Sequence, residues 1–364
     1  MRPVVRRERV ALLVLVALGL LVLEGCNGCS RQIHFTPAGS DSTGVHSADS
    51  LRAMVRRVQE LWETSEGGEE AAQTTAIIVR EDLQVHPGEP WAGRSRKLLD
   101  SLDIGAELAA DRRVLAVNFF ARSRPDAGAW PWLLWRTPHA VAMRPLAGRN
   151  LQLVQVATLP DPNGTPEAWG QVAVLFARRS AAGREPLVMV WGPPAGDDWG
   201  PIQTLGGDSL GGVGSVELMT DGDTSIVLTA RTFRGMPRFE ECATCPHVYA
   251  LHRFRWGPNG FARIEDRAVP SPYSSFVQFV LALGAGDHDA AARFVTDPAL
   301  LEQARLFEFN ALPKGAWRAA PATDESAGTM VFFRGQQEAY QVSFEPRGEE
   351  WLINAIRPTT RSIE

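Results

Sequence analysis

The sequence has little lysine, tyrosine and cysteine, and it has no long apolar run. Lys97 and Lys314 are its only lysines, so arginine carries nearly all of the positive charge. Together with the high alanine, glycine and proline contents, this bias is typical of a GC-rich genome rather than of a particular function. The longest apolar run has 14 residues, whereas a helix that crosses a bilayer needs about 20. This shortage argues against a membrane-spanning helix.

A basic stripe interleaved with aromatic residues is also missing. The formal net charge is −5 at pH 7, and residues 1–25 hold four arginines against two glutamates, so the remaining chain carries −7. An acidic chain without a basic stripe repels a phosphate backbone, so no nucleic acid is expected as a partner. Apolar residues make up 45%, which is ordinary for a globular chain with a core. The length of 364 residues fits about two domains.

The N-terminus carries the most specific pattern. Four arginines within residues 2–9 precede the apolar run of residues 10–23, whose length is that of a signal-peptide core. The sequence Leu-Glu-Gly-Cys that ends at Cys26 follows directly. It resembles the bacterial lipobox, in which the cysteine is acylated and becomes the first residue of the mature chain. Glu24 departs from the small residue that is usual there, and Cys29 is a poorer candidate.

This resemblance implies a signal peptide over residues 1–25 and a membrane partner reached through a lipid on Cys26. An uncleaved signal anchor and a secreted chain without lipid are alternatives, and both also place the body outside the cytoplasm. Asn27, in place of the Asp that retains such proteins at the inner membrane, favours the outer membrane of the cell envelope. Residues 26–48 are expected to form the lipidated cysteine and a flexible tether, about 25 Å long on average.

Residues 49–268 are predicted to form a β-rich domain with short N-terminal helices. Apolar residues at helical spacing indicate a helix over 51–63, residues 64–73 are expected to form a loop, and strand patterns begin at 75–79. The triplet Trp-Gly-Pro occurs twice, 65 residues apart, each time before a glycine turn, which suggests a duplicated β unit. A sandwich and a propeller-like fragment both remain open.

Residues 269–364 are predicted to form an α+β domain, which makes the whole chain α+β. Ser271-Pro272 and Asp297-Pro298 are typical of helix starts, and alternating apolar residues predict strands after residue 330. The segment from Phe279 to Ala291 matches the F-x-x-A-L-x-x-G-D-x-x-A-A opening of the nuclear-transport-factor-2-like cone fold, which the region therefore resembles. The resemblance implies an apolar pocket, and its candidate lining residues are Trp317, Phe332, Tyr340 and Trp351.

Cys242 and Cys245 form the second cysteine pair. Outside the cytoplasm such a pair is normally oxidised, so a disulfide that closes a hairpin loop is expected. A thiol-redox site needs a helix N-terminus, which the sequence does not predict here. A zinc site would add His247 and His252, but their spacing does not give a clear second ligand pair. We therefore expect neither a metal nor a cofactor.

Two further motifs resemble functional sites. The segment Gly207–Gly211 reads GDSLG, the nucleophile motif of the GDSL hydrolases, but no histidine follows an Asp by three residues, so Ser209 has no predicted base. Glu217, Asp221 and Asp223 resemble the calcium loops of FG-GAP/VCBS-type β repeats, with too few acids for a full Ca²⁺ shell. Both motifs are predicted to be turns.

No catalytic residue is predicted. The expected function is therefore non-catalytic ligand binding or scaffolding by a membrane-anchored lipoprotein, with a small molecule, a glycan or a protein as partner. The alternatives are a small-molecule enzyme with its site in the C-terminal cone, and a metal or redox module at Cys242 and Cys245.

Overall fold

The computed structural model describes residues 48–359 with eleven internal gaps, at 65–67, 112–113, 126–127, 147, 162–168, 193–198, 222–224, 241, 243, 311–315 and 321–327. Residues 1–47 form a separate unit of the chain. The predicted signal segment, Cys26 and the tether up to residue 47 therefore lie outside the described residues. Within the described residues, no helix has both the length and the apolar character needed to cross a bilayer.

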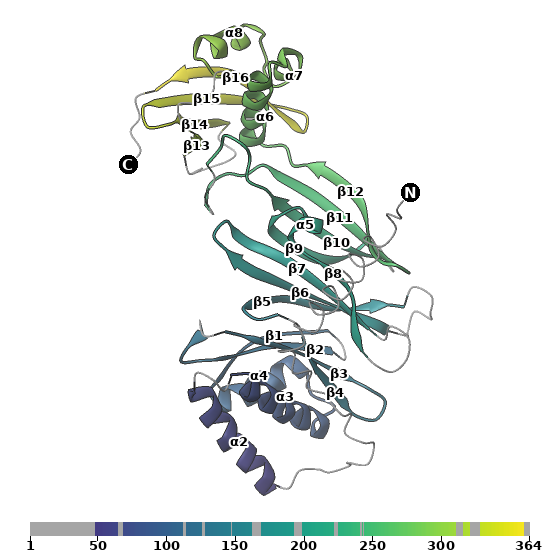
Figure 1. The fold of residues 1–364 in the computed structure, drawn as a ribbon. Helices are drawn as coiled ribbons and strands as arrows, with labels where there is room; N and C mark the ends of the chain where they lie inside the picture. Colours follow the sequence, from purple (N-terminus) through teal and green to yellow (C-terminus); the bar gives the residue numbers. More distant parts are fainter. Residues whose placement is uncertain are drawn as a thin grey trace, which may run out of the picture. The chain divides into compact units, whose positions relative to one another are not determined.

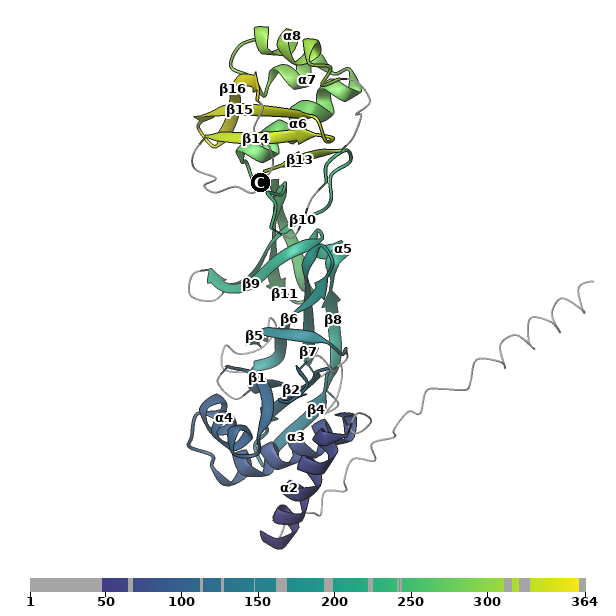
Figure 2. The same cartoon turned by 90° about the vertical axis from the view of Figure 1, so that its left-hand side faces the viewer.

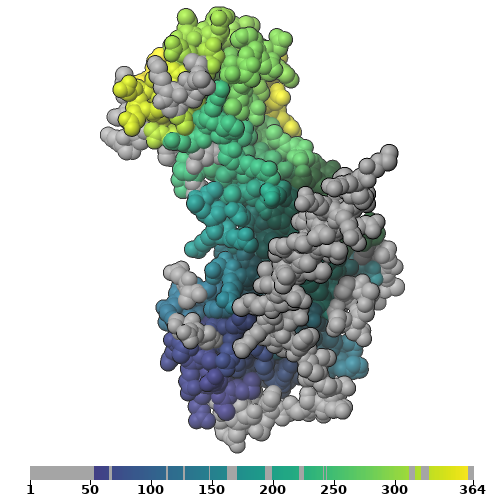
Figure 3. All heavy atoms as spheres, viewed as in Figure 1, coloured from purple at the N-terminus to yellow at the C-terminus, as the bar shows by residue number. Residues whose placement is uncertain are grey.

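Four antiparallel sheets of four strands each form most of the described chain. Each sheet consists of four consecutive strands in chain order, so successive segments appear as contiguous bands of colour in Figure 3. The described residues close into neither a barrel nor a propeller. The predicted α+β class is confirmed, with β structure dominant.

Three helices cover one face of the first sheet (Figure 2). They are α2 (Ala48–Glu63), α3 (Gly68–Val85) and α4 (Trp91–Ser101). The sheet consists of β1 (Ile104–Asp111), β2 (Val114–Ala121), β3 (Trp130–Arg136) and β4 (Val141–Pro145). The helix predicted over residues 51–63 is confirmed as part of α2.

Helix α3 corrects the loop predicted over residues 64–73 and the strand predicted over 75–79. The β-branched residues from Thr74 onward favour a strand by propensity. However, buried side chains recur every three or four residues along one helix face, at Ala72, Ala76, Val79 and Leu83. Thr75 is also buried in the helix, where its hydroxyl accepts a hydrogen bond from the Trp62 indole at 3.1 Å. Burial against α2 and the sheet therefore outweighs local propensity.

The second sheet is buried on both faces. It consists of β5 (Leu151–Pro160), β6 (Trp169–Ser180), β7 (Gly183–Gly192) and β8 (Gly200–Leu205). Val174 and Phe176 on one face of β6 pack with Leu133 of the first sheet. Ala173 and Leu175 on the other face pack against the third sheet. This two-sided burial explains why residues 172–177 form a continuous apolar run without strand alternation.

The third sheet consists of β9 (Val213–Asp221), β10 (Ser225–Phe233), β11 (Tyr249–Gly257) and β12 (Gly260–Ala268), and the one-turn helix α5 (Gly207–Leu210) precedes it. The two hairpins predicted around Trp-Gly-Pro are confirmed as β7–β8 and β11–β12. Each hairpin supplies the third and fourth strands of its sheet. The two copies thus occupy equivalent places, as the 65-residue spacing suggests.

The C-terminal region packs three helices against the fourth sheet (Figure 1). The helices are α6 (Pro272–Ala285), α7 (His288–Ala292) and α8 (Ala299–Leu306). The strands are β13 (Trp317–Ala319), β14 (Thr329–Arg334), β15 (Glu338–Arg347) and β16 (Glu350–Pro358). The predicted start of α6 is confirmed, because the Ser271 hydroxyl accepts a hydrogen bond from the Ser274 amide.

A segment from the third sheet also enters this C-terminal core. Phe239, in the connection between β10 and β11, forms a parallel bridge with Trp317 and is buried in the same apolar cluster as Phe276. The backbone hydrogen bonds are Trp317 N to Arg238 O and Glu240 N to Trp317 O, both 2.8 Å long. The connection therefore adds an edge contact to β13.

The two-sided burial of the second sheet can be tested with two truncations. Phe176→Ala removes a fully buried ring and should lower the free energy of unfolding by about 3–5 kcal/mol. Val154→Ala, on β5 of the same sheet, truncates a side chain that is 48% exposed. It should change the free energy of unfolding by less than about 0.5 kcal/mol. Urea denaturation followed by circular dichroism measures both. Equal, small effects would contradict the packing described here.

Candidate functional site

Aromatic side chains fill the interior of the C-terminal region. Phe276, Trp317 and Phe332 are almost completely buried, and the rings of Phe276 and Phe332 stack with centroids 3.7 Å apart. Of the four residues predicted to line a pocket, Trp317, Phe332 and Tyr340 lie in this core, whereas Trp351 is only partly buried beside it. These rings thus pack against one another and form a core.

A buried arginine, which sequence analysis did not identify, completes this core. Arg334 is only 6% exposed, and its guanidinium lies 5.4 Å from the Trp317 ring centroid and 5.8 Å from that of Tyr340. It donates hydrogen bonds to the carbonyls of Phe307 and Glu308 at 2.8 Å and to the Glu338 carboxylate at 2.6 Å. The sequence did carry one signal of this burial. Arg334 follows Phe332 by two residues on β14, so both side chains lie on the same, inward face of the strand.

Tyr340 shares this network. Its hydroxyl donates a hydrogen bond to Glu338 Oε2 at 3.0 Å. Burial, aided by this bond, raises the pKa of Tyr340 to about 12, although the nearby Arg334 charge acts in the opposite direction. A phenol with such a pKa stays protonated at neutral pH. The Arg334–Glu338–Tyr340 network is therefore suited to holding α8 and the sheet together rather than to acid–base chemistry.

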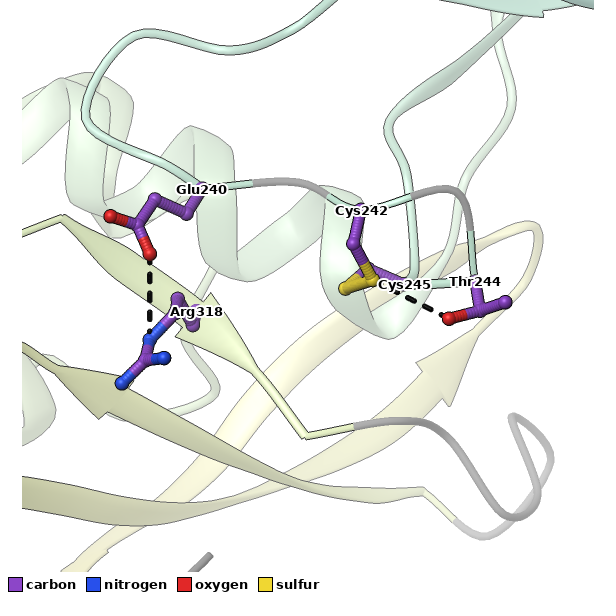
Figure 4. The surroundings of a disulfide bond; sticks show 5 residues. All are labelled: Glu240, Cys242, Thr244, Cys245 and Arg318. Carbon is purple, nitrogen blue, oxygen red and sulfur yellow. Dashed lines mark hydrogen bonds and ion pairs between the residues drawn. A yellow bond between two sulfur atoms is a disulfide. The ribbon is translucent and has the colours of Figure 1, made fainter. Parts of the chain in front are cut away.

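Cys242 and Cys245 lie in the connection between β10 and β11. Their sulfur atoms are at disulfide distance, with Cα atoms 5.0 Å apart (Figure 4). The Cys245 amide donates a hydrogen bond to the Cys242 carbonyl at 2.9 Å. On the same connection, Glu240 forms an ion pair with Arg318 of β13 at 3.6 Å. Oxidation of the pair in the cell stays a prediction. Among the described residues, no group of three or more His, Cys, Asp or Glu is placed to hold a metal ion.

The GDSL segment forms the one-turn helix α5. The Ser209 hydroxyl donates to the Gly206 carbonyl and accepts from the Gly206 amide, both at 3.0 Å. Gly211 ends the turn in the left-handed conformation, with φ of +88°. The following residues enter β9, so the predicted passage from turn into strand is confirmed. Ser209 thus holds the turn closed.

A histidine and a carboxylate lie close to this turn. His252 and Asp266 are paired across β11 and β12, and His252 Nδ1 lies 3.1 Å from Asp266 Oδ1. A Cβ atom at Gly211 would come within 2.1 Å of His252 Nε2. Burial lowers the pKa of His252, with Asp266 opposing that shift, so the ring is neutral at pH 7. The search for a histidine three residues after an aspartate missed this pair, because strand register brings it together.

The described hydrogen bonds of the Ser209 hydroxyl lie within its own turn. In the described structure the Ser209 hydroxyl bonds to Gly206, and His252, only 6% exposed, packs beneath Gly211. A serine nucleophile requires its base within hydrogen-bond reach. The arrangement therefore supports close packing of α5 on the third sheet.

The acidic motif on β9 is only partly described. Glu217 is exposed and lies opposite Thr229 on β10. Asp221 is the last residue of β9, and the structure does not describe its side chain; Asp223 lies outside the described residues. The structure thus brings no second described acid to Glu217, and a calcium site there stays untested.

A small cavity lies where the third sheet meets the start of α6. Its volume is about 80 Å³, and its polar lining comes from Arg231, His247, Tyr249 and Ser271. The Arg231 guanidinium lies over the Tyr249 ring, 4.4 Å from its centroid. The His247 ring is buried and stacks on Phe233 with centroids 3.5 Å apart. None of the ten described lining residues is acidic, and ring contacts hold two of the polar ones in place, so we take this cavity as the candidate binding site.

Sequence analysis named His247 only as a possible zinc ligand, and it did not identify Arg231, Tyr249 or Ser271 as binding residues. Ser271 was recognised, but as a helix cap. The four come from β10, from the loop before β11, from β11 and from the start of α6. Nothing in their spacing along the chain indicates a common site. The pairing of β10 with β11 brings Arg231 close to Tyr249, and His247 and Ser271 join them in the lining of the cavity.

The close contact at Gly211 gives a sharp test of the turn. Gly211→Ala should lower the free energy of unfolding by about 2–4 kcal/mol, because it combines a left-handed alanine with a clash against His252. Gly207→Ala is the matched control, since a Cβ atom there meets nothing within 4 Å. Thermal unfolding compares the two variants. An unchanged midpoint for Gly211→Ala would show that the turn does not pack on His252.

Tyr340 should be visible in an alkaline titration. The chain has three tyrosines, and we expect one to ionise near pH 12, a step that Tyr340→Phe removes. Because the folded-state pKa is raised, the stabilisation is complete below pH 10 and is lost as the pH rises towards 12. Tyrosinate absorbance measures the ionisation. Ionisation of all three tyrosines near pH 10 would contradict the buried network.

Comparisons with known proteins do not assign these residues a role. The chain matches no family model, no curated protein and no solved structure. The lipobox, the cone-like opening and the calcium-loop motif are therefore resemblances that rest on the residues quoted for them. Any function has to be argued from the N-terminal sequence and from the geometry of the described side chains.

Proposed function

We propose that this protein is a lipoprotein of the cell envelope, anchored through Cys26 and facing the periplasm or the exterior. The observation that carries this proposal is the 14-residue apolar run that follows an arginine-rich start and ends in Leu-Glu-Gly-Cys. The run is too short to span a bilayer, but it is long enough for a cleaved signal. A cysteine pair at disulfide distance is consistent with an oxidising compartment.

Within that location the protein acts by binding rather than by catalysis. Ser209 is engaged by the Gly206 backbone, and Tyr340 is kept protonated within a buried network. By contrast, the cavity between β10, β11 and α6 presents an arginine and a histidine, and none of its described lining residues is acidic. Binding of a small ligand needs only such a placed set of polar groups.

The finer architecture belongs to the same proposal. The first three sheets are consecutive four-stranded meanders that share apolar clusters, which is the way blades of a propeller-like fragment pack. The C-terminal helices and sheet have the element order of a nuclear-transport-factor-2-like cone. In this view the β-rich part is a rigid scaffold, and the tether sets its distance from the membrane.

Lipid attachment is tested by exchanging the two N-terminal cysteines one at a time. Cys26→Ser should move the protein from the membrane fraction to the soluble fraction, whereas Cys29→Ser, the matched control, should leave it in the membrane. Intact mass spectrometry of the wild-type protein should show loss of residues 1–25 and added fatty acyl chains. Unchanged fractionation of Cys26→Ser, with residues 1–25 still attached, would overturn the proposal.

A further inference from the structure

We propose that the cavity formed by Arg231, His247, Tyr249 and Ser271 binds a small oxyanion, namely a carboxylate or phosphate group. This inference rests on the binding role proposed above and adds the chemical class of the ligand. It is argued from the charge, the size and the rigidity of the cavity.

The charge of the cavity selects an anion. Arg231 is permanently positive, and none of the described lining residues is acidic. The residues paired with Arg231 across the sheet are Ser215 on β9 and Leu251 on β11, so no carboxylate lies directly opposite it in these two strands. A guanidinium can bind an oxyanion through two parallel N–H donors.

The size of the cavity limits the ligand. The cavity has a volume of about 80 Å³. Measured in the same way, a cavity needs at least about 10–15 Å³ to hold one water molecule. The cavity therefore holds the equivalent of several waters, which corresponds to a single phosphate or carboxylate group. A larger ligand could place only its charged group inside. Sugar rings and nucleobases are too large for this space.

The walls of the cavity are rigid. The Arg231 guanidinium is held over Tyr249, and His247 is held between the face of Phe233 and the edge of Tyr249, with centroids 3.5 and 5.9 Å away. Pro246 and His247 form part of one wall and directly follow Cys245, so the cysteine pair constrains the backbone just before this wall. Such preorganised donors lose little conformational entropy when a ligand binds.

The start of α6 supplies an additional hydrogen-bonding group, the Ser271 hydroxyl. Pro272, the first residue of this 14-residue helix, also lines the cavity but has no N–H to donate. A helix N-terminus attracts negative charge, as the Arg231 guanidinium also does. The arginine nevertheless supplies the main attraction, and the test therefore targets it.

Calorimetric titration of the detergent-solubilised full chain tests this inference, with inorganic phosphate and acetate as separate probes. We expect saturable binding of at least one probe with one site per chain. Arg231→Gln should weaken that binding at least about tenfold, since it removes charge-assisted hydrogen bonds. The matched control is Arg255→Gln, an exposed arginine on the same face of the sheet, which should change the affinity less than about twofold.

The outcomes separate this inference from the proposed function. Saturation by phosphate alone or by acetate alone supports the site and identifies which oxyanion it prefers. Equal weakening in Arg231→Gln and Arg255→Gln, or no saturable binding of either probe by a protein with a normal unfolding midpoint, overturns it. Membrane attachment is measured independently through Cys26→Ser, so loss of the oxyanion site would leave that proposal standing. Arg231→Lys keeps the charge and should bind with intermediate affinity.

Discussion

The insertion of Phe239 into the C-terminal core is the contact on which the candidate site depends. It carries the long connection between β10 and β11 away from the third sheet and onto the edge of β13. The rest of that connection then returns past the cysteine pair and brings His247 onto Phe233. Without this contact, nothing would hold the connection in the position that places the buried His247 beside Arg231. The cavity is thus a consequence of how the third sheet meets α6.

The pairing of buried polar groups explains how the described residues of the motifs that resemble catalytic sites are held in the structure. Buried polar groups must be paired, because leaving them without partners costs more than most single contacts contribute. Arg334 is surrounded by carbonyls, by Glu338 and by aromatic faces, and the Ser209 hydroxyl is engaged by the backbone of its own turn. Groups that are fully engaged in this way hold structure together. Reactive groups would need to face a space that a substrate can enter, and the described cavity is lined by groups suited to binding.

Local signals in the sequence predicted much of the fold, and long-range pairing accounts for most of what was missed. The cap at Ser271 and the two Trp-Gly-Pro hairpins depend on neighbouring residues, and they were predicted correctly. Strand β1 was missed because its sequence, IGAELAAD, has low β propensity and is fixed by pairing with β2. The His252–Asp266 pair, Arg334 and the cavity all join residues from different strands or loops. Their proximity depends on how distant strands and loops pack together, and the spacing of residues along the chain does not predict this.

We propose that the protein works by binding an anionic group at the junction of the third sheet and α6, while the described networks around Ser209 and Arg334 stabilise the fold. A crystal structure of the full-length protein grown with phosphate would decide between these roles. We expect one oxyanion within hydrogen-bonding distance of the Arg231 guanidinium, with the Ser209 and Arg334 networks unchanged. An oxyanion bound instead beside Ser209 and His252, or among the rings around Arg334, with nothing at Arg231, would contradict it.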